Sequence, residues 1–176
     1  MDRARTLFEA AGHTLNLSRV YLVISWVYLD EHRFPDALNA IEEAWKYAEL
    51  SGSLSSQMVI SQTFGIILFK TNQDTKAWKY IEISLRHASY IGDRYHIAIT
   101  LDYMGYGYLR RGDYQNAYGA YEAAAEKFLG TIATVAVKRC KDNMAGIERK
   151  QENPDEVVGF HRPSSDNDRT LFYPPV

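Results

Sequence analysis

The chain has 176 residues, of which 46% are hydrophobic and 24% are charged, and its formal net charge is −2. This composition excludes an intrinsically disordered chain, and the near-neutral charge argues against a nucleic-acid binder, which would carry a basic excess. The single cysteine, Cys140, excludes an internal disulfide and a cysteine-based zinc site, so we expect a cytoplasmic protein. No stretch approaches the roughly 18 apolar residues that cross a bilayer, so we expect no membrane partner.

A 40-residue period runs through the sequence. Three segments end in glycines that lie 40 residues apart, Gly12, Gly52 and Gly92. A helix C-terminus favours glycine because glycine accepts a positive φ. Other positions repeat at the same spacing, namely the series Ala37, Ala77, Ala117, Val157 and the series of small residues Ser25, Gly65, Gly105, Ala145. Small side chains at a fixed spacing let neighbouring helices approach closely, so the pattern predicts stacked helical units.

The expected elements are all helices. In chain order we expect a partial helix over 2–11, helix pairs over 18–31 with 35–51, 57–71 with 74–91 and 94–111 with 114–128, and a last helix over 131–151. In the third pair, Gly112 ends the first helix and Asp113 is the candidate N-cap of the second. Because the array begins on half a pair, we expect it to continue a longer array or to meet a second chain. Residues 152–176 contain four of the five prolines, which predicts an extended or disordered tail.

The clearest unit resembles a known repeat. Within AITLDYMGYGYLRRGDYQNAYGAYEAAAEKF, the tetratricopeptide pattern W-x2-L-G-x2-Y is matched in spacing by Leu101, Met104, Gly105 and Tyr108, and its A-x3-F by Ala117 and Tyr121. The chain therefore resembles the tetratricopeptide-repeat (TPR) family, although its period is 40 residues rather than 34. The resemblance implies an all-α, α–α superhelical solenoid of helix hairpins over 1–151, with units at about 18–57, 58–97 and 98–130, partial units at 1–12 and 131–151, and a tail at 152–176.

The resemblance also implies a function. TPR proteins bind partners in a concave groove lined by the first helix of each pair, so we expect a protein-interaction scaffold or adaptor that binds a peptide or helix of another protein. The groove residues that the family pattern assigns here are Arg19, Leu22, Trp26, Leu29, Gln62, Ile66, Phe69, Asp102, Tyr106, Leu109, Arg139 and Arg149. One alternative is a C-terminal sensing domain of a larger signalling protein, such as a STAND-type NTPase or a transcriptional regulator. A third class is self-association through open solenoid ends.

Some of these residues have a second interpretation. Trp26 and Tyr106 are either groove anchors or packing residues between tightly coiled units. The cations of the last helix either meet an acidic peptide or a phosphate, or they favour the helix dipole and solvate the end of the solenoid. In the tail, the large apolar residues Phe160, Leu171, Phe172 and Tyr173 either fold back over the open end of the array or form a docking motif. The lysine and asparagine clamp with which TPR proteins hold chaperone C-termini is missing.

We expect no enzyme activity, cofactor or metal. The five histidines show no metal-ligand spacing, and no glycine-rich phosphate loop or nucleophile motif occurs. Gly105 and Gly107 flank Tyr106 inside an expected helix, where they cannot cradle a phosphate. Cys140 has no evident histidine partner in the sequence.

Overall fold

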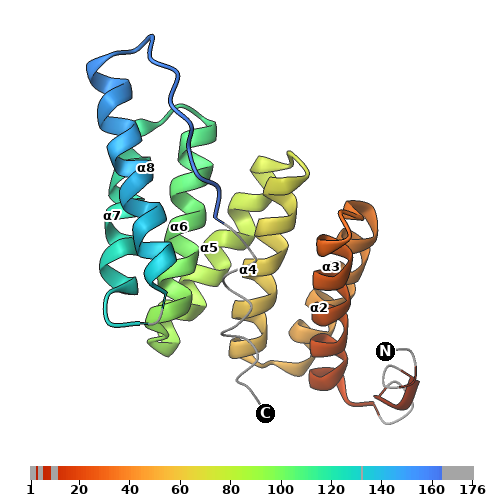
Figure 1. Ribbon diagram of the computed structural model, residues 1–176. Helices are drawn as coiled ribbons and strands as arrows, with labels where there is room; N and C mark the ends of the chain where they lie inside the picture. Colours follow the sequence, from red (N-terminus) through yellow and green to blue (C-terminus); the bar gives the residue numbers. More distant parts are fainter. Residues whose placement is uncertain (1–2, 4–5, 9–11, 132, 164–176) are drawn as a thin grey trace. The chain divides into compact units, whose positions relative to one another are not determined.

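The computed structural model describes residues 3, 6–8, 12–131 and 133–163, and Figure 1 traces its helices. The helices are α2 (Thr14–Asp30), α3 (Phe34–Ser51), α4 (Leu54–Lys70), α5 (Asp74–Ile91), α6 (Arg94–Arg110), α7 (Tyr114–Phe128) and α8 (Thr134–Glu152). No strand occurs among the described residues. The chain divides into two compact units, Met1–Asp93 (unit 1) and Arg94–Val176 (unit 2).

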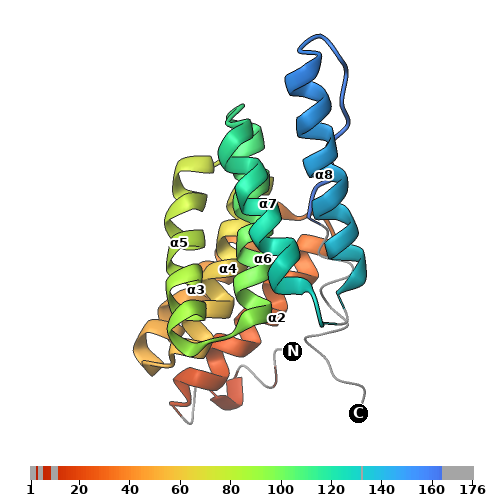
Figure 2. The same ribbon diagram turned by 90° about the vertical axis from the view of Figure 1, so that its left-hand side faces the viewer.

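Each unit consists of helices that pack on their neighbours along the chain. In unit 1, α2 pairs with α3 and α4 pairs with α5, and both α2 and α3 contact α4 (Figure 1). In unit 2, α7 packs on α6 and on α8 (Figure 2). Short connections make consecutive helices antiparallel. The predicted all-α fold of stacked helical hairpins is therefore confirmed within each unit.

The turn inside each hairpin is the same in all three pairs. The residues at 32, 72 and 112 adopt positive φ, with values of 57° for His32, 60° for Asn72 and 72° for Gly112. The next residue's N–H returns to a carbonyl five positions earlier, as in Arg33 to Tyr28 at 2.8 Å. This is the Schellman arrangement, which satisfies carbonyls at a helix end. The turns recur every 40 residues and reproduce the period of the sequence.

The ends of the second helices follow the glycine series. Gly52 and Gly92 adopt φ of 66° and 79°, in the left-handed region that glycine accepts without strain. The predicted cap of α7 is also present, because the Asp113 carboxylate accepts a hydrogen bond from the Asn116 N–H at 3.2 Å. Ser53 caps α4 in the same way, through the Ser56 N–H.

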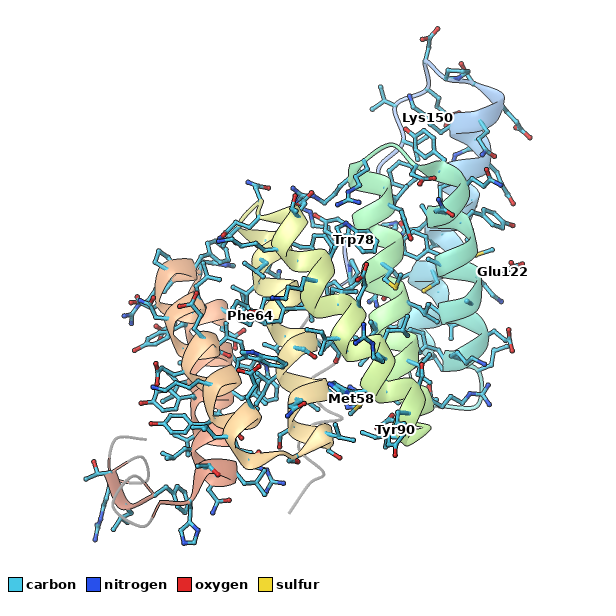
Figure 3. All side chains as sticks on the ribbon, turned by 180° about the vertical axis from the view of Figure 1, so that it is seen from behind. Met58, Phe64, Trp78, Tyr90, Glu122 and Lys150 are labelled. Carbon is cyan, nitrogen blue, oxygen red and sulfur yellow. The ribbon has the colours of Figure 1, made fainter. Side chains whose placement is uncertain are left out.

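The core follows the repeated positions. Ala37, Ala77 and Ala117 are all fully buried, and in unit 1 the ring of Phe64 stacks on that of Tyr80 (Figure 3). The fourth member of the alanine series does not join the core, because Val157 is 98% exposed. Within the described residues the packed period therefore ends with α8, because residues 153–163 do not form a second helix that would bury position 157.

The element boundaries agree with the expected ones to within a few residues, and two points need comment. The partial helix expected over 2–11 lies partly outside the described residues, and those described there, 3 and 6–8, are helical. Along the chain, the boundary between the two compact units falls between α5 and α6. Residues 153–163, which were expected to begin an extended or disordered tail, belong to the compact part of unit 2.

Candidate functional site

In unit 1, the residues assigned to the groove lie on α2 and α4, and they differ in exposure. Arg19 is exposed, Trp26 and Ile66 are half-buried, and Leu22, Leu29, Gln62 and Phe69 are buried. The indole Nε1–H of Trp26 donates to Thr63 Oγ1 at 3.3 Å, which ties α2 to α4. In this unit most of the assigned side chains pack between helices, so only Arg19, Trp26 and Ile66 offer surface to a partner.

Unit 1 also has a pocket, which lies away from the assigned groove residues. A pocket of about 290 Å³ is lined by Leu38, Glu42, Phe64, Leu68, Gln73, Lys76, Lys79 and Tyr80, from α3, α4, α5 and the turn before α5. None of the assigned groove residues belongs to it. Its aromatic floor is the stacked pair Phe64 and Tyr80, whose centroids lie 4.0 Å apart. Burial raises the pKa of Tyr80, with the acidic side chains of Glu49 and Glu42 adding to the effect.

In unit 2, two assigned residues meet each other. Arg139 Nη2 on α8 donates to Asp102 Oδ2 on α6, and the two side chains are only 8% and 1% exposed. Asp102 was assigned to the groove, but it is buried, and its carboxylate pairs with Arg139 of α8 rather than facing a partner. Burial raises the pKa of Asp102, and the Arg139 guanidinium opposes that rise.

The buried pair has two titratable neighbours. Tyr121 and Cys140 are both fully buried. Burial raises the pKa of each, and the Asp102 carboxylate raises it further. Both groups therefore stay protonated near neutral pH, and Cys140 is a packing residue rather than a nucleophile.

Because the Cys140 thiol is buried and protonated, we expect it to react slowly with disulfide reagents. The native chain should leave Cys140 unmodified by dithiobis-nitrobenzoate at mildly alkaline pH, because only the exposed thiolate attacks a disulfide. Adding denaturant should release one equivalent of the chromophore per chain. The measurement is absorbance against time in both conditions, and equal rates with and without denaturant would contradict the buried, protonated thiol.

The remaining assigned residues of unit 2 are more accessible. Tyr106 and Leu109 are half-buried. The guanidinium of Arg110 lies 5.8 Å from the centre of the Tyr106 ring. Arg149 is exposed, and its Nε lies 3.2 Å from Glu156 Oε1. The basic end of α8 therefore already contacts an acidic side chain, and that side chain belongs to the same polypeptide.

Residues 153–163, the C-terminal strap, turn back along α8 (Figure 1). Asn143 holds the strap through both polar atoms of its fully buried side chain: its Nδ2 donates to the His161 carbonyl at 2.8 Å, and its Oδ1 accepts from the His161 N–H at 2.7 Å. Lys150 adds hydrogen bonds to the carbonyls of Pro154 and Glu156 (Figure 3). α8 thus binds the main chain of the strap.

Side chains of the strap alternate in burial. Glu156, Val158 and Phe160 are half-buried, whereas Val157 and Gly159 between them are exposed. A period of two is typical of an extended chain with one side against a surface. Pro163 is buried at the end of the strap.

Gly146 on α8 makes room for the strap. A Cβ built there would lie 2.9 Å from Val158 Cγ1 and 3.0 Å from Phe160 Cε1, closer than real contacts allow. The Phe160 ring also lies 6.4 Å from that of Tyr114 on α7. Of the two interpretations of Phe160, the structure shows the fold-back onto the helices. Leu171, Phe172 and Tyr173 lie outside the described residues.

Sequence reasoning missed Asn143 and Gly146. A glycine inside a helix often marks the close approach of another chain segment, and Gly146 is such a residue. Asn143 gave no comparable signal, because a polar residue in a helix is normally solvated. Together with Arg139 and Lys150, these residues follow the spacing i, i+4, i+7 and i+11, which places them on one face of α8.

Among the described residues, no group of three or more His, Cys, Asp or Glu side chains is placed to hold a metal ion. In the same part of the chain, no helix combines the length and apolar character needed to cross a membrane. No protein-family model matches the chain, and a search of curated proteins finds no match.

Proposed function

We propose that the chain is a non-enzymatic, cytoplasmic scaffold or adaptor of the TPR type, which binds a segment of a partner protein on its first helices. Support for the TPR assignment comes from the three identical Schellman turns at 32, 72 and 112, which repeat at the 40-residue period. Within each unit the assigned residues lie on the first helices of the hairpins, which are α2 and α4 in unit 1 and α6 and α8 in unit 2.

The observation that carries the proposal is the strap on α8. Asn143 binds both the N–H and the C=O of a single residue in an extended segment. Main-chain hydrogen bonds of this kind give affinity for any extended polypeptide, and pockets for alternate side chains add specificity. The face of α8 that holds residue 161 is therefore a surface suited to a partner's extended segment.

A peptide-display selection on the immobilised full chain tests the proposal. In the chain that carries Phe160→Ala, whose strap lacks its aromatic anchor, we expect enriched peptides to bind at least about tenfold more weakly when Asn143→Ala is added, because a lost pair of hydrogen bonds is worth on the order of 1–3 kcal/mol. The matched control is Asn116→Ala, since Asn116 is exposed on α7 and makes only local contacts with Asp113. Failure to enrich any sequence on the Phe160→Ala chain, or enriched peptides that bind this chain equally well with and without Asn143→Ala, would refute binding at this surface.

A further inference from the structure

The strap shows which residues the α8 surface accepts. Three positions spaced by two contact the surface: Glu156 pairs with Arg149 at 3.2 Å, and Val158 and Phe160 cover Gly146. Three residues after Phe160, Pro163 is buried. The residues between these positions, such as Val157 at 98% exposure, point to solvent and carry no requirement.

These contacts define a pattern. It is an acidic residue, an apolar residue two positions later and an aromatic residue four positions later, in a segment that continues to a proline seven positions after the acidic residue. The acidic position is matched by a cation, because Arg149 and Lys150 lie at the end of α8. The apolar and aromatic side chains fit the space that Gly146 leaves on α8 because it has no side chain. The main chain between aromatic residue and proline is matched by Asn143.

We propose that the α8 surface binds a partner segment with this pattern in an extended conformation, and that the partner must displace the strap, which occupies the same surface in the free chain. This inference rests on the proposed function and adds the class of ligand and its regulation. A tethered segment competes at an effective concentration in the millimolar range, so the strap lowers the apparent affinity for a free segment. Loosening the strap therefore raises that affinity.

The test uses the full chain and a fluorescent peptide with the strap sequence, NPDEVVGFHRP, capped at both ends. Phe160→Ala in the protein removes an anchor of the strap but leaves the α8 surface intact. Fluorescence anisotropy should show the peptide binding this variant about tenfold or more tightly than it binds the wild-type chain. A peptide with alanine in place of Val157 should bind equally well, because that side chain is exposed, whereas a peptide with alanine in place of Phe160 should not bind.

Two second-site variants show that the peptide uses the proposed surface. Adding Asn143→Ala to the Phe160→Ala chain should abolish peptide binding. If that variant loses its helical circular dichroism, Gly146→Ala replaces it, because its new Cβ clashes only with strap atoms among its nearest contacts and alanine favours the helix. Retained binding in the folded Gly146→Ala, Phe160→Ala chain would overturn the proposal.

Further outcomes show whether the α8 surface is occupied by the chain's own strap, by a second copy of the chain or by a partner segment. Equal peptide affinity for wild-type chain and Phe160→Ala would overturn the competition. A wild-type dimer in light scattering that dissociates in Phe160→Ala would mean that the strap occupies a second copy, which also overturns it. Peptides selected by display that require Asn143 but lack the spacing of acidic, apolar and aromatic residues would leave the proposed function standing and refute this inference alone.

Discussion

Replacing Arg139 with methionine should lower the free energy of unfolding by about 3–5 kcal/mol. Arg139 and Asp102 form an ion pair with side chains 8% and 1% exposed, so neither charge is screened by solvent. Methionine keeps much of the packing volume but leaves the Asp102 carboxylate buried without its opposite charge, which is far more costly than losing a surface pair. The measurement is urea denaturation at neutral pH followed by far-UV circular dichroism.

The double variant Asp102→Leu, Arg139→Met is the matched control. It removes both charges and fills the space with apolar side chains, a change that is often neutral or stabilising in other proteins. We therefore expect it to recover most of the stability that the single variant loses. A double variant that unfolds as easily as Arg139→Met would show that the loss comes from packing and would contradict the electrostatic explanation.

The ion pair also predicts how the loss depends on pH. Burial raises the pKa of Asp102, and Arg139 opposes this rise, so Arg139→Met should raise the pKa further. The unfolded carboxyl titrates near about 3.9, so the folded variant takes up its proton at a higher pH than the unfolded one does. Stability then rises as the pH falls through the folded-state pKa and is lost as the pH rises through it. The destabilisation should therefore be smaller at about pH 5 than at about pH 7.

Much of the fold could be predicted from the sequence because small and turn-forming residues recur at the 40-residue spacing of the repeat. The glycine series at 12, 52 and 92 located the ends of the second helices, and all three residues adopt positive φ. His32 shows where this reasoning stops. It occupies the same left-handed turn position as Asn72 and Gly112, but histidine carries no turn signal of its own. Only the 40-residue register and the backbone geometry reveal its role.

The site was less predictable, for physical reasons. A spacing rule identifies the face of a helix on which a residue lies, but not what the next helix places over it. Phe69 lies on the expected face, yet it is 1% exposed because the ring of Trp78 packs edge-on against it at 6.0 Å. The sequence contains opposite charges at Asp102 and Arg139, but both residues were expected to face a partner protein rather than each other. The strap has no helical period, and its position depends on a few hydrogen bonds from Asn143.

Substituting leucine for Gly105 should lower the free energy of unfolding by roughly 1–3 kcal/mol. A Cβ at Gly105 would lie 2.8 Å from Cδ1 and Cε1 of the Tyr121 ring, which is fully buried. Gly65 meets Ile81 in the same way one unit earlier, with a Cβ distance of 2.6 Å to Cγ1. We infer that the small residues of this series set the distance between the two helices of each pair.

Substituting leucine for Gly119 distinguishes the effect of close helix packing from the effect of helix propensity. Gly119 lies within α7, is exposed, and has nothing within 4 Å of an added Cβ. Leucine there should stabilise the chain by about 0.5–1 kcal/mol, because glycine is a poor helix former. Thermal melts of the two variants should therefore shift in opposite directions. A Gly105→Leu chain that melts at or above the wild-type temperature would contradict close packing against Tyr121, since the gain in propensity alone would then decide the result.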